Sequence, residues 1–341
     1  MNQPETNNDP LVSILGTGCP EVLFDFDKEG TDFSEIRLLY QYGEYIGGSE
    51  AGSVMGVNKY CSAFTLWMQK SGREDIPDIS DKPAVRWGNL LEPVVLSETA
   101  EILGIHIEKP NYMYLHPAHH FMTANFDGIT EDGRLVEVKT TDSYEIKNMM
   151  ERGEIPPSWY AQIHHYSCFR IPEWHSMAGE PFKGFVLSVK THMQKDPYVF
   201  DEDIDWDYCR ELVNTERFFC NGLKNGVPPL PDGSESASES VRHLPMKEGE
   251  MDATEEVREH WQAAKDAAKE KSLAEKSYRF HKNYLHQLMS EKGITKIRGC
   301  AYTQTTSRLN QGLLKKRLAE HNLTHLIEEC KENSPPFVKL V

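Results

Sequence analysis

Two short stretches decide the fold of this chain: Asn-Phe-Asp-Gly-Ile at 125–129 and Leu-Val-Glu-Val-Lys at 135–139. With the turn sequence Glu-Asp-Gly at 131–133 between them, they predict strands over 122–129 and 135–140, joined as a hairpin or meander. Side chains two apart on a strand share a face, so Glu137 and Lys139 point the same way. Asp127, at the end of the neighbouring strand, is expected to converge on them.

This grouping suits a divalent metal. Two carboxylates on a rigid sheet are hard oxygen donors of the kind that Mg²⁺ prefers, and the carbonyl of Val138 could add a third ligand. A lysine beside such a metal could orient or deprotonate water and stabilise charge on a phosphate, which is the chemistry of phosphodiester hydrolysis. The alternative interpretation is that Asp-Gly is a turn and that Glu137 and Lys139 are ordinary side chains of a half-exposed strand.

Two further residues favour the metal site. Glu92 lies between Gly88 and Leu96 on one strip of a predicted helix over 85–103, an awkward place for a carboxylate without a partner. Gln162 lies on a predicted helix over 159–169, where its amide could hold the attacking water or a phosphate. The alternative for Gln162 is a solvent-facing side chain.

The order of the predicted elements indicates an α/β (α+β) fold with a mixed central sheet flanked by helices. Beyond the elements already given, a glycine-bearing turn is predicted at 47–49, helices at 62–69, 144–152 and 206–223, and strands at 105–109, 112–115, 185–189 and 198–201. Three prolines at 228–231 and a Ser/Glu-rich run at 233–240 predict an exposed linker over 233–250.

The C-terminal part, 251–341, is predicted to be a mainly helical extension. Apolar residues at Val257, Trp261, Ala264 and Ala268 follow a helical stripe that fails at Lys271 and Glu275. A helical hairpin or bundle helix over 251–289 is therefore favoured over a long coiled coil. The tail is expected to hold an extended stretch at 297–303 and a helix at 313–318.

Composition limits the class of protein. The chain has 341 residues, 39% of them apolar, and no apolar run of the ~20 residues that would cross a bilayer. The first ten residues lack the features of a secretory signal, and the seven cysteines are scattered without a Cys-x-x-Cys pair. We therefore expect a cytoplasmic protein with reduced, mostly buried thiols.

The net charge of −16 counts against nucleic-acid binding, but it is unevenly distributed. The segment 1–36 carries eight acidic residues and one basic residue, whereas 251–341 carries sixteen Lys or Arg and twelve Asp or Glu. A local basic surface is compatible with this pattern.

Several other side chains have both a functional and a structural interpretation. A zinc cluster at His116, His119 and His120 is disfavoured because Pro117 opposes a helix there. The pair His164 and His165 could contact DNA phosphates, although one of them should face inward. Three tryptophans could wedge between bases, although core packing is favoured for at least two of them: Trp67, Trp87 and Trp159.

Five motifs occur in the order and spacing of the lambda-exonuclease (YqaJ-like viral recombinase) family, which the chain resembles from about residue 40 to residue 166. They are Ile46-Gly47-Gly48-Ser49-Glu50, Trp87-Gly88-x3-Glu92, Asp127-Gly128, Glu137-x-Lys139 and Tyr160-Ala161-Gln162. The resemblance implies a PD-(D/E)xK nuclease core over 37–232, after an acidic N-terminal segment over 1–36.

The same resemblance implies an activity and partners. It implies 5′-to-3′ degradation of one strand of linear duplex DNA, which leaves 3′ single-stranded overhangs, with two Mg²⁺ ions per site that Mn²⁺ could replace. It also implies a homotrimeric ring, a single-strand annealing recombinase as partner, and an origin in a phage, prophage or related mobile element in a bacterial host.

Family roles are carried over residue by residue. Asp127, Glu137 and the Val138 carbonyl would hold metal, Lys139 would be the catalytic lysine, and Glu92 would assist the second metal. Gln162 would position the nucleophile or the lysine.

Three further positions concern the pocket for a terminal 5′-phosphate. Ser49 would belong to this pocket and Asn125 would border it. The family usually has Arg seven residues before the serine, but this chain has Tyr42, so Arg37 or Arg86 would have to substitute. The need for a 5′-phosphate stays open.

Two alternatives to the exonuclease remain. One is a restriction- or repair-type endonuclease on the same core, which would cut closed circular DNA. The other is a DNA-binding or recombination-assembly protein with an inert core, which the presence of all four charged site residues argues against. The extension over 251–341 could lengthen the DNA channel, stabilise the oligomer or dock the annealing partner.

Overall fold

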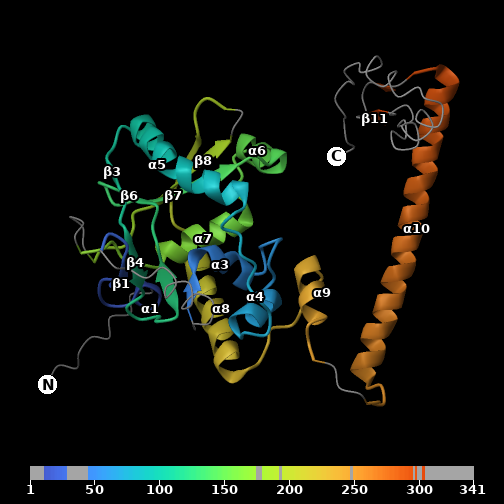
Figure 1. Ribbon diagram of the computed structural model, residues 1–341, viewed down its shortest axis with the longest axis horizontal. Coiled ribbons are helices and arrows are strands. Elements are labelled where there is room, and N and C mark those ends of the chain that lie inside the picture. The colour runs from blue at the N-terminus through green and yellow to red at the C-terminus, as the bar shows by residue number, and fades with distance from the viewer. Residues whose placement is uncertain are drawn as a thin grey trace, which may run out of the picture. The chain divides into compact units, whose positions relative to one another are not determined.

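The computed structural model describes residues 11–28, 45–173, 179–191, 194–245, 249–294, 296–297 and 302–303. The chain divides into two compact units, Met1–Met246 and Lys247–Val341, shown in Figure 1. The first unit is a mixed α/β structure, and the second is dominated by one helix. This agrees with the predicted α/β core and helical C-terminal region.

A five-stranded sheet forms the centre of the first unit, in the order β3 (Ile107–Glu108), β6 (Gly128–Thr130), β7 (Leu135–Thr141), β8 (Phe185–Thr191) and β9 (Tyr198–Glu202). β6 and β7 are antiparallel, with Gly128 opposite Val136, so the predicted pairing of these two stretches is confirmed. β7 and β8 are parallel, whereas β8 and β9 are antiparallel. The sheet is therefore mixed.

A second sheet has four strands, in the order β1 (Glu21–Asp25), β4 (Tyr112–Leu115), β5 (Met122–Ala124) and β2 (Ile46–Gly47). The single strand predicted over 122–129 is thus wrong, because β5 and β6 belong to different sheets. The chain passes from one sheet to the other at 125–127. Asp127 lies at this crossing, directly before β6 begins. Its side chain accepts a hydrogen bond from the Val138 N–H of β7.

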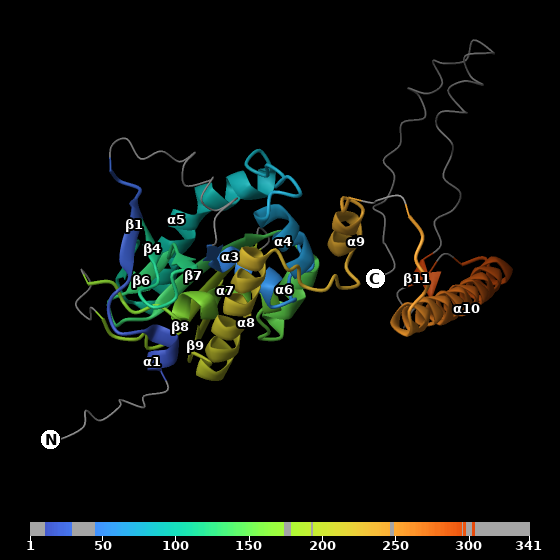
Figure 2. The ribbon, with the colours of Figure 1, turned by 90° about the horizontal axis from the view of Figure 1, so that it is seen from below.

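Helices cover both faces of the five-stranded sheet, as Figure 2 shows. On one face, α5 (Pro83–Leu103) packs Val95 and Leu96 against Val136, Val138 and Val186. On the other face, α7 (Pro157–Ser167) and α8 (Trp206–Asn225) pack against the large core that includes the alternate residues of β7 and β8. Even-numbered residues of β7 therefore face α5, and odd-numbered residues face α7.

Shorter helices complete the first unit: α1 (Val12–Leu15), α3 (Gly48–Val54), α4 (Ala63–Lys70) and α6 (Tyr144–Glu151). The turn predicted at 47–49 is instead the junction of β2 and α3. Glu50 closes this junction, because its carboxylate accepts a bond from the Gly47 backbone at 3.0 Å. A side chain at Gly48 would collide with the Tyr166 ring, so glycine allows α3 to pack closely on α7.

The N-terminal segment is more than an acidic extension. Ile14 and Leu15 of α1 are buried in the main core, and β1 pairs with β4. The consecutive apolar residues Ile14 and Leu15 supply the core contacts, and the β1 backbone supplies the strand pairing. Residues 11–28 therefore belong to the first unit, whereas 1–10 and 29–44 lie outside the described residues.

The predicted linker over 233–250 also differs from the structure. Residues Glu235–Val241 form α9, which begins at the N-cap Ser234. Ala237 and Ser240 are fully buried, and the Ser240 hydroxyl lies 3.0 Å from that of Thr65 on α4. Serine is typical of both linkers and helix caps, so composition alone pointed to the wrong alternative.

The second unit contains α10 (Glu255–Lys292), a single continuous helix of 38 residues. It begins at the N-cap Thr254 and ends at Gly293, whose φ of 59° suits glycine. The helix predicted over 251–289 is therefore confirmed, and the alternative of a helical hairpin is wrong. β10 (Lys296–Ile297) and β11 (Tyr302–Thr303) form a short antiparallel pair that overlaps the two ends of the extended stretch predicted at 297–303. The helix predicted at 313–318 lies outside the described residues.

Two further expectations concern composition. In the part of the chain that the structure describes, no helix combines the length and the hydropathy needed to cross a membrane. The five cysteines placed there are free thiols, and three of them, Cys168, Cys209 and Cys220, are buried.

Candidate active site

The candidate active site forms where β6 begins beside the middle of β7. Asp127 directly precedes β6, and its Oδ2 atom accepts a hydrogen bond from the Val138 N–H at 2.8 Å. The N–H and C=O of one residue point to the same side of a strand, so the Val138 carbonyl is also directed toward the Asp127 side. The hairpin therefore brings one carboxylate and one backbone carbonyl together.

Glu137 is the centre of the site. Its side chain is 1% exposed, and Oε1 receives bonds from Lys139 Nζ at 2.5 Å and from Gln162 Nε2 at 2.7 Å. Because Glu137 and Lys139 are odd-numbered residues of β7, they share the face that α7 covers, where Gln162 is located. This burial excludes the interpretation of Glu137 as a half-exposed strand residue and of Gln162 as a solvent-facing one.

The charges of the site perturb one another. Burial raises the pKa of Asp127 well above its ordinary value, and the charge of Glu137 raises it further. Burial likewise raises the pKa of Glu137, against the opposing effect of Lys139. Burial alone would lower the pKa of Lys139, but the charges of Glu137 and Asp127 reverse this and raise it. The combined effect of burial and the neighbouring charges is therefore to raise the pKa values of all three groups.

The donor set fits a hard divalent cation. Glu137 Oε2 is buried and has no hydrogen-bond partner among the described residues, which is costly for a carboxylate oxygen. A cation ligated by Glu137, Asp127 and the Val138 carbonyl would satisfy it and relieve the repulsion between the carboxylates. The described residues contain no cluster of three or more His, Cys, Asp or Glu side chains placed to hold a metal. Mg²⁺ is compatible with this, since it usually binds through one or two carboxylates and keeps several waters.

Residues 32–168 match the model of the YqaJ-like viral recombinase domain. This part of the chain is therefore similar to the YqaJ-like viral recombinase domain. The matched residues include the first unit from β2 to α7, and thus every residue of the site described so far.

Comparison with individual proteins gives more distant matches. The uncharacterized protein YqaJ of Bacillus subtilis (strain 168) is 29% identical over 215 residues, which are 63% of this chain and 64% of that protein. The chain therefore spans less than two thirds of this relative's length. The crystal structure of an alkaline exonuclease from Laribacter hongkongensis, LHK-Exo, covers 56% of this chain at 16% identity, with 93% of its own chain covered and a TM-score of 0.44. The same protein in complex with dAMP covers 55% at 17% identity, with 92% of its chain covered and a TM-score of 0.43.

Glu92 also lies within the matched residues, but its position differs from that of the other carboxylates. It lies on α5, against the face of the sheet opposite to α7, and forms an ion pair with Lys109 after β3. Its charge still contributes to the raised pKa values of Asp127 and Glu137. Lys109 was not singled out in the sequence, because nothing in the local pattern indicates a partner 17 residues away.

The residues expected around a terminal phosphate are partly described. Ser49 is exposed in the first turn of α3, Asn125 is exposed between β5 and β6, and Arg86 is exposed on α5. Arg37 and Tyr42 lie outside the described residues, so the substitution of the family arginine is not tested.

Tyr166 is a site residue that the sequence analysis missed. Its hydroxyl lies 3.4 Å from Gln162 Nε2, and its ring packs against Gly48 at the start of α3. The four-residue spacing from Gln162 places both side chains on one face of α7, which was the available signal.

The other histidine candidates have structural roles. His116 and His119 are buried, and backbone groups engage their ring nitrogens, with His116 Nε2 at 3.0 Å from the Cys168 carbonyl. His164 and His165 are both fully buried, so contact with DNA phosphates is excluded for either of them. His165 Nδ1 lies 2.8 Å from Glu216 of α8, and its Nε2 lies 3.0 Å from the Thr123 carbonyl of β5.

The tryptophans divide as expected. Trp67 is fully buried and Trp159 packs against the main core, whereas Trp87 on α5 is 59% exposed. Trp87 lines a groove of about 1190 Å³ between α5 and the ends of β7 and β8. The groove is bordered by Thr140 and Thr141, directly after Lys139, and three lysines contribute to its lining: Lys82, Lys190 and Lys195.

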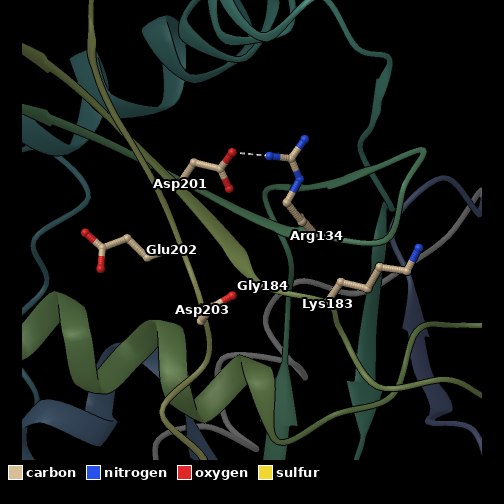
Figure 3. Close-up of a pocket in the computed structure, with 6 residues that line it drawn as sticks. All are labelled: Arg134, Lys183, Gly184, Asp201, Glu202 and Asp203. Atoms are coloured by element: carbon tan, nitrogen blue, oxygen red, sulfur yellow. Dashed lines mark hydrogen bonds and ion pairs between the residues drawn. The ribbon is translucent and has the colours of Figure 1, made fainter.

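A smaller pocket of about 440 Å³ lies at the other end of β7. In Figure 3, Asp201 is directed at Arg134, with which it forms an ion pair, and Glu202 points away from it. Arg134 also pairs with Asp132. Since Arg134 precedes β7, this pocket is separated from Lys139 by the length of the strand.

Proposed function

We propose that this protein is a Mg²⁺-dependent nuclease that degrades one strand of linear double-stranded DNA from its ends. The observation that carries the proposal is the buried Glu137 carboxylate, which has one oxygen on Lys139 and Gln162 and the other without a protein partner. This arrangement occurs within a YqaJ-like viral recombinase domain. Recombination requires processed DNA ends, which agrees with a nuclease acting there.

The residues divide the chemistry between them. Asp127, Glu137 and the Val138 carbonyl would hold the cation, with Glu92 contributing negative charge from α5. Bound Mg²⁺ would activate water and neutralise charge on the scissile phosphate. Lys139 would orient or deprotonate the attacking water and stabilise negative charge on the phosphate. Gln162 fixes the orientation of Glu137 through its 2.7 Å bond.

The finer parts of the proposal depend on the five ordered motifs and their resemblance to the lambda-exonuclease family. They are 5′-to-3′ polarity, 3′ overhangs as product, two Mg²⁺ ions with Mn²⁺ as substitute, and a homotrimeric assembly. The same resemblance supports a single-strand annealing recombinase as partner and action in the cytoplasm of a bacterial host of a phage or other mobile element. Ser49 and Asn125, with Arg37 or Arg86, are proposed to contact the DNA end.

The test uses purified protein with Mg²⁺ and a linear duplex labelled at its 5′ or its 3′ end, beside covalently closed circular DNA. Early release of the 5′ label as mononucleotide, with the circle intact, is expected. Cutting of the circle would identify an endonuclease, and no cleavage of any substrate would identify a DNA-binding protein. Protein with Lys139→Ala is the control for contaminating nucleases.

A further inference from the structure

The helix α10 has an uneven distribution of charge. Its first part, 255–275, contains six acidic and four basic residues. The following fifteen residues, 276–290, contain no acid and carry Lys276, Arg279 and Lys282 with two histidines. An acid-free cationic stretch of this length stands out in a chain with a net charge of −16.

Exposed aromatic side chains are interleaved with these cations. Phe280 is 66% exposed, Tyr284 is 60% exposed and Tyr278 is 59% exposed. Burial of such rings is normally favourable, and three of them within seven residues of an exposed helix indicate a binding surface. We call 276–287 the basic-aromatic segment.

The segment has a defined exposed face. Lys276, Phe280 and Tyr284 follow one another at four-residue intervals, so they lie along one side of the helix, next to Arg279. Leu285 is half-buried and Met289 is fully buried on the opposite side, whereas the half-buried Leu288 follows Tyr284 by four residues and ends the exposed face. The side that carries Leu285 and Met289 is therefore covered, and the side that carries Lys276, Phe280 and Tyr284 is open.

This chemistry fits single-stranded DNA. Aromatic faces stack on unpaired bases, and nearby Lys and Arg neutralise the phosphates, which together form a sequence-tolerant binding surface. We propose that the basic-aromatic segment binds a single DNA strand, with Phe280 and Tyr284 as stacking platforms. The choice of DNA rests on the proposed function, since the 3′-ended strand would be the product of the reaction.

Two other occupants fit the observations less well. Docking of a protein partner would use an aliphatic stripe at helical spacing, which here is the covered side. Pairing of two copies of α10 would need a continuous apolar seam, which Lys271 and Glu275 interrupt. Neither accounts for the absence of acidic residues over 276–290.

The test measures binding of a fluorescent twenty-nucleotide oligothymidylate to the full chain by anisotropy, in EDTA so that no cleavage occurs. Phe280→Ala and Tyr284→Ala should each weaken binding about fivefold or more. The double variant Lys276→Gln with Arg279→Gln should lower the slope of log Kd against log salt concentration by about 1.4, because each lost phosphate contact on a single strand removes about 0.7. Trp261→Ala is the matched control, because Trp261 is 61% exposed on the same helix but lies in its first part, where acidic residues outnumber basic ones, and it should leave affinity unchanged.

Unchanged affinity in the Phe280 and Tyr284 variants would overturn the inference, and so would an equal loss in the Trp261 variant. A loss of self-association without a loss of DNA affinity would assign the surface to a second copy of the chain and would also overturn it. Circular dichroism confirms that each variant keeps its helix. Failure of the proposed function can be distinguished from failure of this inference. A protein that cleaves no DNA but binds the oligonucleotide through Phe280 and Tyr284 would contradict the proposed function and leave this inference intact.

Discussion

The central carboxylate of the candidate active site is buried, whereas the aromatic rings of the basic-aromatic segment are exposed. At the site, Glu137 is 1% exposed and takes its partners from β7 and α7. On α10, Phe280 is 66% exposed and its neighbours come from the same helix. A single change at the site therefore disturbs groups from distant parts of the chain, whereas a change on α10 acts locally.

The largest expected effect is at Lys139. Lys139→Ala should reduce the single-turnover cleavage rate by about 10⁴-fold, because it removes the positive charge next to the scissile phosphate. Affinity for DNA ends, measured by anisotropy in EDTA, should stay within about twofold of wild type. Lys59→Ala removes a lysine from an exposed 3.1 Å ion pair with Glu145 and is the control. Loss of both cleavage and end binding would show that Lys139 has a structural role instead.

The second effect concerns the buried pair that joins α7 to α8. His165→Ala should lower the free energy of unfolding by about 3–5 kcal/mol, because it leaves Glu216 charged and buried without its partner. Denaturant unfolding measures it, with His120→Ala as the exposed control. A loss below 1 kcal/mol would contradict this assignment.

The same pair predicts a pH dependence. Burial lowers the pKa of His165, but Glu216 more than compensates, so its folded pKa is raised. The contribution of His165 to the free energy of unfolding is therefore complete below its pKa in the unfolded state, ~6.5. It is lost as the pH rises through its pKa in the folded state. His165→Gln should remove that part of the profile.

A third effect links metal binding to pH. The pKa values of Asp127 and Glu137 are raised, so these carboxyls favour the folded state when protonated and lose that contribution as pH rises through their folded values. Mg²⁺ at a hundred times its Kd should stabilise the fold by about 2.7 kcal/mol, and less at low pH, where protons compete. Thermal unfolding at pH 5 and pH 8, with and without Mg²⁺, measures this. Asp127→Asn combined with Glu137→Gln should abolish the difference.

The smallest effect is expected on α10. Leu273 is 59% exposed, so Leu273→Ala should change the free energy of unfolding by less than about 0.5 kcal/mol. Leu187 of β8 is fully buried, and Leu187→Ala should cost about 2–5 kcal/mol. A large effect at Leu273 in denaturant unfolding would indicate that α10 is covered in solution.

The sequence predicted the site better than its surroundings. Period-two spacing on β7 and the Asp-Gly turn were enough to place Asp127 beside the middle of β7 and to put Glu137 and Lys139 on one face. The helical positions of Gln162 and Glu92 also followed from local pattern. Which partner each side chain meets, such as Lys109 for Glu92, depends on packing between distant elements, which a local pattern does not contain.

The errors have similar causes. The residues of α9 are predicted as a linker because most of them are serine or glutamate. The burial of Ala237, which the sequence does not indicate, depends on packing against the rest of the fold. For α10, a hairpin was one of two alternatives, because the apolar stripe fails at Lys271, but the helix is continuous. A helix does not require such a stripe, however, when strong helix formers fill it and no proline or glycine interrupts it between Thr254 and Gly293.

The exposure of α10 has a consequence for the exchange of its backbone amide hydrogens with solvent. Almost all of its side chains are exposed, so the hydrogen bonds of most of the helix are protected only by the helix itself. Its last two turns differ, because Met289 is buried and Leu285 and Leu288 are half-buried. Deuterium should therefore enter the first turns fastest and the turns around Met289 slowest, so that exchange slows from the N-terminal to the C-terminal end rather than being equally fast at both ends.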